Sequence, residues 1–334
     1  MQVLQMPRTS KPRRQERIAA RRSCLVVPGS NPRFHAKADE SKADQVILDL
    51  EDSVAPAAKA QARDQVVSAL RDHVFAGKLK TVRVNACDTA WCYEDIIAVT
   101  EGAGDRVDSL VIPKVDGVDQ VHFVDNLLSQ IEHKLKLTRP IGLELQIESA
   151  RGMQNIGLIA EATDRCQALI FGPADLAASL HIPELTIGGQ LSPSRTSDYQ
   201  DWFLVQVLVS SRANGLQALD GPYARIRDAG GLRVSAERAA RLGFDGKWAV
   251  HPDQIDTLNE VFAPQQEDFD KATAILETYR QASDVENIGA VMLGDEMIDE
   301  ASRKMALITL ERGRSAGMKA RRWPGSSGRY RSPI

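Results

Sequence analysis

The chain has 334 residues and a formal net charge of −3, with 43% apolar and 26% charged residues. This composition is normal for a soluble globular protein with a sizeable core. No apolar run approaches the roughly 20 residues of a membrane-spanning helix, so we expect no membrane-embedded segment. A single (β/α) barrel with extensions is compatible with this length.

Eight apolar segments of strand length follow one another along the chain. They are CLVVPGS (24–30), QVILDLED (45–52), TVRVN (81–85), SLVIPK (109–114), GLELQIES (142–149), QALIFGPADL (167–176), GLQALDGP (215–222) and GKWAVHP (246–252). Helix-compatible segments lie between them. Eight such units in this order predict a closed parallel (β/α)8 barrel, the TIM-barrel fold, over residues 23–260.

Two segments of the chain are additional to the eight strand–helix units of a simple barrel. The interval 177–214 is too long for one crossover and predicts an insertion after the sixth strand, on the face where barrel loops build active sites. Beyond the barrel, residues 261–311 predict a C-terminal helical segment.

Both ends of the chain are basic. Residues 1–22 hold seven Lys or Arg and one acid, and residues 312–334 hold seven and no acid. Such tails can contact nucleic acid or a membrane surface. Because neither tail interleaves aromatic residues or builds an apolar face, we predict a basic N-terminal extension and a flexible basic C-terminal tail. We expect both tails to be solvated or to contact another subunit, with no nucleic-acid or membrane partner.

Four cysteines are scattered as Cys24, Cys87, Cys92 and Cys166, without a CxxC pair or a zinc-like Cys/His spacing. The simplest interpretation is a reducing, cytoplasmic compartment. The N-terminus lacks the apolar region of a secretory signal, although its many arginines leave an organellar transit peptide open.

Polar residues stand at the carboxyl ends of most predicted strands, the face where barrel enzymes place their chemistry. In chain order they are Asp49, Glu51, Asp52, Arg83, Asn85, Lys114, Glu148, Asp175, Asp220 and His251. Crowded carboxylates repel each other and are costly to desolvate, and a cation offsets both penalties.

Oxygen ligands without Cys or clustered His favour a hard ion such as Mg²⁺, with Mn²⁺ as an alternative. Glu148 and Asp175, at the ends of the neighbouring fifth and sixth strands, are the predicted direct ligands. Taken singly, either acid is equally well explained as a helix N-cap or a solvated carboxylate. Their occurrence together favours a metal site.

Several motifs carry a family resemblance: CLVVPGSNPR, VILDLEDSVAP, VRVN, IESARG with FGPADLA, LDGP, GFDGKWAVHPDQI and DEMID. In this order and spacing, over about residues 22–310, the chain resembles the HpcH/HpaI aldolase and citrate lyase beta subunit family of CoA-ester lyases, malyl-CoA lyases in particular. The resemblance implies a Mg²⁺-dependent barrel that cleaves or forms a 3-hydroxyacyl-CoA, such as malyl-CoA, citramalyl-CoA or citryl-CoA. The two products of cleavage are an acyl-CoA, formed first as its enolate, and a 2-oxo acid such as glyoxylate.

The resemblance also assigns roles to individual residues. Glu148 and Asp175 match the family's metal ligands, Arg83 matches its substrate arginine, and Glu51 and Asp52 match acids that hold metal-bound waters. Asp299, in DEMID, matches an acid that reaches into a neighbouring subunit's site, where it would protonate the enolate carbon. A homo-oligomer, a trimer or a hexamer, is implied.

The CoA thioester needs a phosphate contact. The turn PGSNPR, with Ser30 and Arg33, offers backbone N–H groups at a helix start and is a candidate anion site. A capped helix with Pro in its first turn explains the same residues equally well.

Three alternatives remain open from the sequence. Lys114 at a strand end predicts a metal-independent Schiff-base aldolase, which leaves the acid cluster unexplained. A citrate lyase beta-type subunit would act on a thioester carried by an acyl-carrier partner. A non-catalytic binding protein is the third, and the joint presence of Arg83, Glu148, Asp175 and Asp299 argues against it.

Other polar residues have plainer explanations. We expect Asp44 and Asp95 to be helix caps or surface charges, Asp220 to shape a turn, and His251 to order a loop. Glu144 is expected to face the barrel interior as a structural partner. Asp49 has the least certain role among the acids of the second strand.

Overall fold

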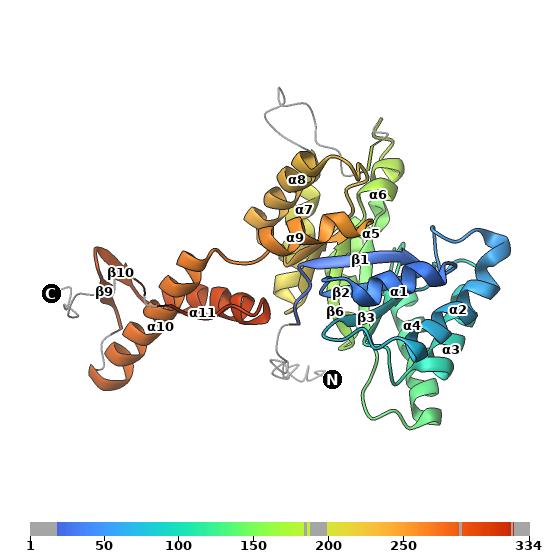
Figure 1. Cartoon of the computed structure of the whole chain (residues 1–334), viewed down its shortest axis with the longest axis horizontal. Coiled ribbons are helices and arrows are strands. Elements are labelled where there is room, and N and C mark those ends of the chain that lie inside the picture. Colours follow the sequence, from blue (N-terminus) through green and yellow to red (C-terminus); the bar gives the residue numbers. More distant parts are fainter. Residues whose placement is uncertain (1–18, 184–185, 188–198, 287–288, 322, 324–334) are drawn as a thin grey trace, which may run out of the picture.

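The computed structural model describes residues 19–183, 186–187, 199–286, 289–321 and 323 (Figure 1). Eight parallel strands close into a barrel in the order β1-β2-β3-β4-β5-β6-β7-β8, with β8 paired to β1. Helices follow the strands along the chain, so the predicted TIM barrel is confirmed. The barrel strands are β1 (Ser23–Pro28), β2 (Gln45–Asp49), β3 (Leu79–Arg83), β4 (Ser109–Ile112), β5 (Gly142–Ile147), β6 (Cys166–Phe171), β7 (Gln217–Asp220) and β8 (Gly246–Ala249).

The helices of the barrel region surround these strands. They are α1 (Pro32–Glu40), α2 (Lys59–Asp72), α3 (Cys92–Ala103), α4 (Val118–Leu135), α5 (Ala150–Glu161), α6 (Pro173–Ser179), α7 (Tyr199–Ala213), α8 (Ala229–Leu242) and α9 (Ile255–Val261), with short 3₁₀ turns at Pro56–Ala58 and Pro252–Gln254. Side-chain N-caps define where two of these helices begin. Ser149 caps α5 by accepting from Gly152 N, and Asp228 caps α8 by accepting from Gly231 N. The expected run of strand six over 167–176 is too long, because the strand ends at Phe171 and Pro173 opens α6.

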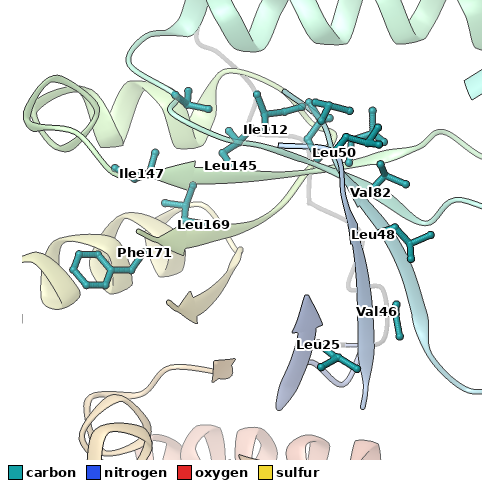
Figure 2. Close-up of a cluster of buried hydrophobic side chains, with 14 of the residues drawn as sticks. Leu25, Val46, Leu48, Leu50, Val82, Ile112, Leu145, Ile147, Leu169 and Phe171 are labelled. Atoms are coloured by element: carbon teal, nitrogen blue, oxygen red, sulfur yellow. The ribbon is translucent and has the colours of Figure 1, made fainter. Parts of the chain in front are cut away.

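Side chains alternate between the two faces of each strand. On β5, Leu143, Leu145 and Ile147 belong to the apolar layer between strands and helices, part of which Figure 2 shows. Residues 144 and 146 between them are buried polar side chains that point to the barrel interior. A separate interior cluster, formed by Cys24, Ile47, Val111, Ala168, Ile170, Leu219 and Trp248, fills the middle of the barrel.

The end of the barrel where the amino ends of the strands meet is closed by a buried polar network. Glu144 accepts hydrogen bonds from Gln45 Nε2 at 2.7 Å and Ser109 Oγ at 2.8 Å, which agrees with the expected structural role of Glu144. Arg21, 4% exposed, enters this network through Glu144 Oε1 at 3.3 Å and also donates to Gln167 and Gln217. The described end of the N-terminal extension therefore packs into the barrel rather than standing in solvent.

The C-terminal segment forms an arm that projects away from the barrel (Figure 1). It consists of α10 (Gln266–Glu286), the antiparallel pair β9 (Val291–Leu293) and β10 (Glu296–Ile298), and α11 (Glu300–Ser315). Its own small core contains Ala274, Ala282, Val291, Leu293 and Ile298. Arg312 of α11 ties the arm to the barrel, because its Nη2 donates to Asp245 Oδ1 at 2.9 Å.

Two predicted regions are only partly described. The insertion after strand six includes α6 and α7, but 184–185 and 188–198 lie outside the described residues. Of the C-terminal tail predicted to be flexible, 322 and 324–334 also lie outside them, and its first residues, up to Ser315, belong to α11. Residues 1–18 of the N-terminal extension lie outside the described residues as well. Among the described helices, none is long and apolar enough to cross a membrane.

Candidate active site at the barrel mouth

The mouth of the barrel, where the carboxyl ends of the strands meet, gathers most of the sequence-predicted residues. Arg83 is the last residue of β3 and Glu148 follows β5. Glu51 and Asp52 follow β2, and Asp175 lies in the first turn of α6. Asp175 was expected at a strand end; it comes from a helix because Gly172 and Pro173 end the strand first.

Arg83 is held by two acids of the neighbouring strand. Its Nε lies 2.6 Å from Asp49 Oδ1 and its Nη2 lies 2.8 Å from Asp49 Oδ2, a two-pronged pair that fixes the guanidinium plane. Burial alone would raise the pKa of Asp49, but the charge and hydrogen bonds of Arg83 hold it below its ordinary value. The sequence left Asp49 without a clear role, and the structure makes it the main partner of Arg83.

Glu51 faces Arg83 from the second side. Its Oε2 lies 2.9 Å from Arg83 Nη1 yet accepts no well-aligned hydrogen bond from any described residue. The ring of Trp248 covers a face of the guanidinium, with 5.2 Å between Arg83 Cζ and the ring centroid. Asp49 thus uses two of the five N–H groups of Arg83, and Nη1 is directed toward Glu51.

The loop that carries Glu51 is built by buried polar contacts. Lys59 Nζ donates to the carbonyl oxygens of Leu50 at 2.8 Å and Glu51 at 2.7 Å. Asn85 Nδ2 donates to Leu50 O at 3.0 Å and to Asp95 Oδ2 at 2.6 Å. The expectation that Asp95 is a cap or surface charge is wrong, because Asp95 is fully buried and anchors Asn85 beneath this loop.

Glu148 is a buried carboxylate, 3% exposed, with a hydrogen bond to each oxygen. Lys114 N donates to Oε1 at 2.8 Å and Gln146 Nε2 donates to Oε2 at 2.6 Å. Burial, followed by the negative charges of Asp175 and Glu51, raises the pKa of Glu148 to about 8.

Gly172 lets β6 approach Glu148 closely. A Cβ at this position would lie 2.4 Å from Glu148 Cβ and 2.5 Å from Glu148 Oε2, so only glycine leaves the carboxylate its position. Asp175 follows three residues later. A glycine between β6 and Asp175, which the sequence patterns did not single out, therefore fixes where the carboxylate of Glu148 lies.

The donor set fits a hard divalent cation. The described residues contain no group of three or more His, Cys, Asp or Glu arranged as a metal cage. Mg²⁺ needs no such cage, since it uses one or two carboxylates and keeps waters or substrate oxygens. Glu51 Oε2 and Gln146 Oε1 are buried acceptors without a hydrogen-bond donor among the described residues, and metal-bound waters would supply donors.

Lys114 contacts the acids of the second strand. Its Nζ bonds to Glu51 Oε1 and lies 3.3 Å from Asp52 Oδ1. Burial would lower the pKa of Lys114, but the hydrogen bond to Glu51 and the charges of Glu51 and Asp52 raise it above its ordinary value. The amine is therefore held in its charged form.

Two groups of predicted residues stand apart from the mouth cluster. Asp299 lies on the projecting arm as the N-cap of α11, where Oδ1 accepts from Ser302 N at 3.0 Å, and this bond lowers the pKa of Asp299. Ser30 and Arg33 flank the start of α1, which Asn31 caps by accepting from Arg33 N at 3.2 Å. Ser30 is half-buried and Arg33 is exposed.

The plainer interpretations of the remaining strand-end residues agree with their contacts. Asp220 Oδ1 accepts from Gly221 N at 2.8 Å within the turn, and Asp220 also pairs with buried Lys247, which the sequence did not indicate. His251 Nδ1 accepts from Asp253 N at 3.2 Å and orders the turn after β8. The expectation that Asp44 is a helix cap or surface charge is wrong, because its side chain is only 11% exposed and forms a two-pronged pair with Arg22 at the opposite end of the barrel.

Comparisons with known proteins show which family the chain resembles. The model of the family HpcH/HpaI aldolase/citrate lyase matches residues 22–252. A relative named L-malyl-CoA/beta-methylmalyl-CoA lyase, from Cereibacter sphaeroides (strain ATCC 17025 / ATH 2.4.3), is 38% identical over 290 residues, covering 84% of this chain and 91% of the relative. A (3S)-malyl-CoA thioesterase from the same organism is 34% identical and covers 78% of this chain and 84% of its own.

Solved structures show the same likeness. The CitE protein of Mycobacterium tuberculosis, in complex with magnesium, acetoacetate and coenzyme A, superposes with a TM-score of 0.68 at 29% identity. The match covers 91% of this chain and all of that one.

Proposed function

The chain belongs to the HpcH/HpaI aldolase/citrate lyase family, and on that premise we propose that it is a Mg²⁺-dependent carbon–carbon lyase acting on a 3-hydroxyacyl-CoA of the malyl-CoA type. Cleavage would give an acyl-CoA and a 2-oxo acid such as glyoxylate, and condensation would be the reverse. The observation that carries the proposal is the buried carboxylate of Glu148 at the same barrel mouth as Arg83, whose guanidinium Asp49 holds in place.

Glu148 and Asp175 would hold the cation, and Gln146 and the backbone N–H of Lys114 orient Glu148 for it. When bound, Mg²⁺ would supply Lewis acidity toward the oxygens of the oxo acid. Asp49 keeps the Arg83 guanidinium in one orientation. The N–H groups of Arg83 that do not bond to Asp49 would donate to the oxyanions that develop during cleavage.

The reaction also needs proton transfers. In cleavage the substrate hydroxyl would give its proton to water, the electrons of the C–C bond would pass into the thioester as an enolate, and the enolate carbon would take up a proton. Asp299 is the proposed acid for that carbon, and in the reverse direction it would remove the proton. Since the arm carries Asp299 away from the barrel, we propose that it serves a neighbouring subunit in a trimer or hexamer.

The CoA moiety would lie against the turn after β1. Ser30 and Arg33 are accessible there beside the capped start of α1, where backbone N–H groups favour an anion. Exposure of Arg33 leaves its guanidinium able to reach a phosphate.

A thioesterase is the second candidate, because the (3S)-malyl-CoA thioesterase covers most of this chain. A beta-type subunit that needs an acyl-carrier partner is a third, since the CitE protein is also similar. The resemblance of the DEMID motif, with Asp299, to malyl-CoA lyases favours a free-standing lyase over the beta-type subunit. The Schiff-base alternative is disfavoured, because Lys114 is held charged by Glu51 and the nucleophile must be a neutral amine.

The test is a coupled assay of the purified protein with Mg²⁺ and a panel of malyl-, methylmalyl-, citramalyl- and citryl-thioesters, each as the CoA ester. Release of 2-oxo acid and of free CoA is followed separately. We expect 2-oxo acid release without free CoA from at least one ester, and loss of that release by roughly 100-fold or more in Glu148→Gln and Asp175→Asn. Free CoA without 2-oxo acid indicates a thioesterase, and full activity in either variant contradicts the metal site.

A further inference from the structure

Lys114 has an unusual backbone for its residue type. Its φ is +53°, in the left-handed region that a side chain with a Cβ rarely adopts. Such conformations persist where surrounding contacts hold them, and they concentrate at functional sites. Here the conformation directs Lys114 N to Glu148 Oε1 at 2.8 Å, directly after Pro113 at the end of β4.

The side chain of the same residue turns to the other acids. Lys114 Nζ bonds to Glu51 Oε1, which is buried, and lies 3.3 Å from Asp52 Oδ1, which is exposed. Lys114 itself is 37% exposed, so its ammonium stands at the rim of the mouth rather than under it. One residue thus connects the proposed metal ligand with the two acids proposed to hold metal-bound waters.

The charge at the mouth makes this arrangement consequential. Among the described residues, the cluster around Arg83 holds more acids than cations, with Asp49, Glu51, Asp52, Glu148 and Asp175 on one side and Lys59, Arg83 and Lys114 on the other. The pair of Asp220 and Lys247 at the same end adds no net charge. Arg83 is tied to Asp49, and Lys59 is turned to backbone carbonyl oxygens. Lys114 is therefore the cation of this group that stands at the exposed rim.

We propose that Lys114 balances the charge of the metal centre, so that the site binds the metal alone less tightly and binds an anionic 2-oxo acid more tightly once the metal is present. The inference deepens the proposed function and rests on it. Its physical basis is that a positive charge near the acids repels a divalent cation and attracts a carboxylate. Removing the charge moves the two affinities in opposite directions, whereas loss of a merely structural contact weakens both.

The experiment uses the full chain and calorimetric titration, first with Mg²⁺ alone and then with glyoxylate on the Mg²⁺-loaded protein. Lys114→Met removes the ammonium, Lys114→Arg keeps the charge, and Lys114→Gly removes the ammonium and relieves the left-handed backbone. Lys114→Gly also serves if Lys114→Met does not fold, as judged by circular dichroism.

In Lys114→Met and Lys114→Gly we expect the Kd for Mg²⁺ to fall and the Kd for glyoxylate to rise, each on the order of tenfold. Both differences should shrink as salt is added, since exposed charges are screened. Lys114→Arg should stay close to the wild type. Weakening of both ligands, or no change in either, overturns the inference. A wild-type chain that binds no Mg²⁺ contradicts the proposed function itself, which separates the two failures.

Discussion

Arg83 and Asp49 form a two-pronged ion pair across β3 and β2, with 2.6 Å between Nε and Oδ1 and 2.8 Å between Nη2 and Oδ2. Both residues are buried. The pair orients the guanidinium before any substrate arrives, so the activity of Arg83 should depend on Asp49.

Asp49→Asn tests this dependence. The amide keeps the size of the side chain but has only one oxygen, so it cannot accept hydrogen bonds from both Nε and Nη2 of Arg83. We therefore expect kcat/KM to fall roughly 10- to 100-fold. The matched control is Asp44→Asn, which breaks a similar fork to Arg22 at the opposite end of the barrel, with Nε–Oδ2 and Nη2–Oδ1 distances of 2.8 Å. Initial rates and thermal unfolding are measured for both. An equal loss of rate in the control would assign the effect to stability instead.

Subunit mixing tests the role of Asp299. Asp299→Ala and Arg83→Ala should each be inactive as homo-oligomers. If the arm serves a neighbouring barrel, mixed oligomers contain some sites with both residues intact and regain part of the activity. Mixing is verified by light scattering and by differently tagged chains. Verified mixed oligomers without recovered activity speak against the cross-subunit role.

Chelation and trapping separate the metal mechanism from a Schiff base. Lys114 is held charged by Glu51, so borohydride with glyoxylate should leave no covalent adduct at Lys114 in the mass spectrum of the intact chain. EDTA should abolish activity, and added Mg²⁺ should restore it. A borohydride adduct in a chain that works in EDTA supports the rival reading.

His35 predicts a pH dependence of stability. It is 1% exposed and its Nε2 lies 3.1 Å from Pro28 O. Burial outweighs that hydrogen bond and lowers the pKa of His35 below its ordinary 6.5. The unfolded chain therefore takes up the proton more readily, and the contribution of neutral His35 to stability is present above pH 6.5 and lost as pH falls through the folded-state pKa.

Urea unfolding at a series of pH values measures this loss. His35→Gln should flatten the decline of the unfolding free energy on acidification. His122→Gln is the control, because His122 also contacts a backbone oxygen, Ala162 O at 3.2 Å, but is exposed. A decline of equal slope in the wild type and His35→Gln would remove the assignment.

Leu145 tests the layer between strands and helices that Figure 2 shows. It is fully buried on β5, so Leu145→Ala should lower the free energy of unfolding by about 3 kcal/mol. Leu158 on α5 is 58% exposed, so Leu158→Ala should change the free energy of unfolding by less than about 1 kcal/mol. Chemical denaturation measures both, and a similar cost at the two positions would contradict the assigned burial.

The barrel was predictable because its signal repeats. Each strand carries alternating or continuous apolar residues, and Leu145 between Glu144 and Gln146 shows why: one face meets helices and the other meets the interior. The strand ends then locate the mouth, so the positions of Glu148 and Arg83 there follow from chain order, whereas the role of Arg83 was predicted from the family resemblance.

Partnerships across the barrel were not predictable in the same way. Asp49 and Arg83 meet because β2 and β3 pair in one register, and Arg21 enters the barrel from a segment that reads as a basic extension. Asp95 reads as a surface acid on α3, but its burial depends on how that helix docks over Asn85. Such facts depend on packing geometry, which local sequence patterns do not encode.

Arg21 also bears on the order in which the chain folds. Its side-chain partners lie 123, 146 and 196 residues further along the chain, on β5, at β6 and on β7. During synthesis, Arg21 and the first strand therefore emerge long before the three side chains to which Arg21 donates. A chain interrupted before β7 has neither Gln217 nor a closed ring, and its early strands remain an open edge. The arginine at the base of the barrel thus has all its side-chain partners only once β7 is in place.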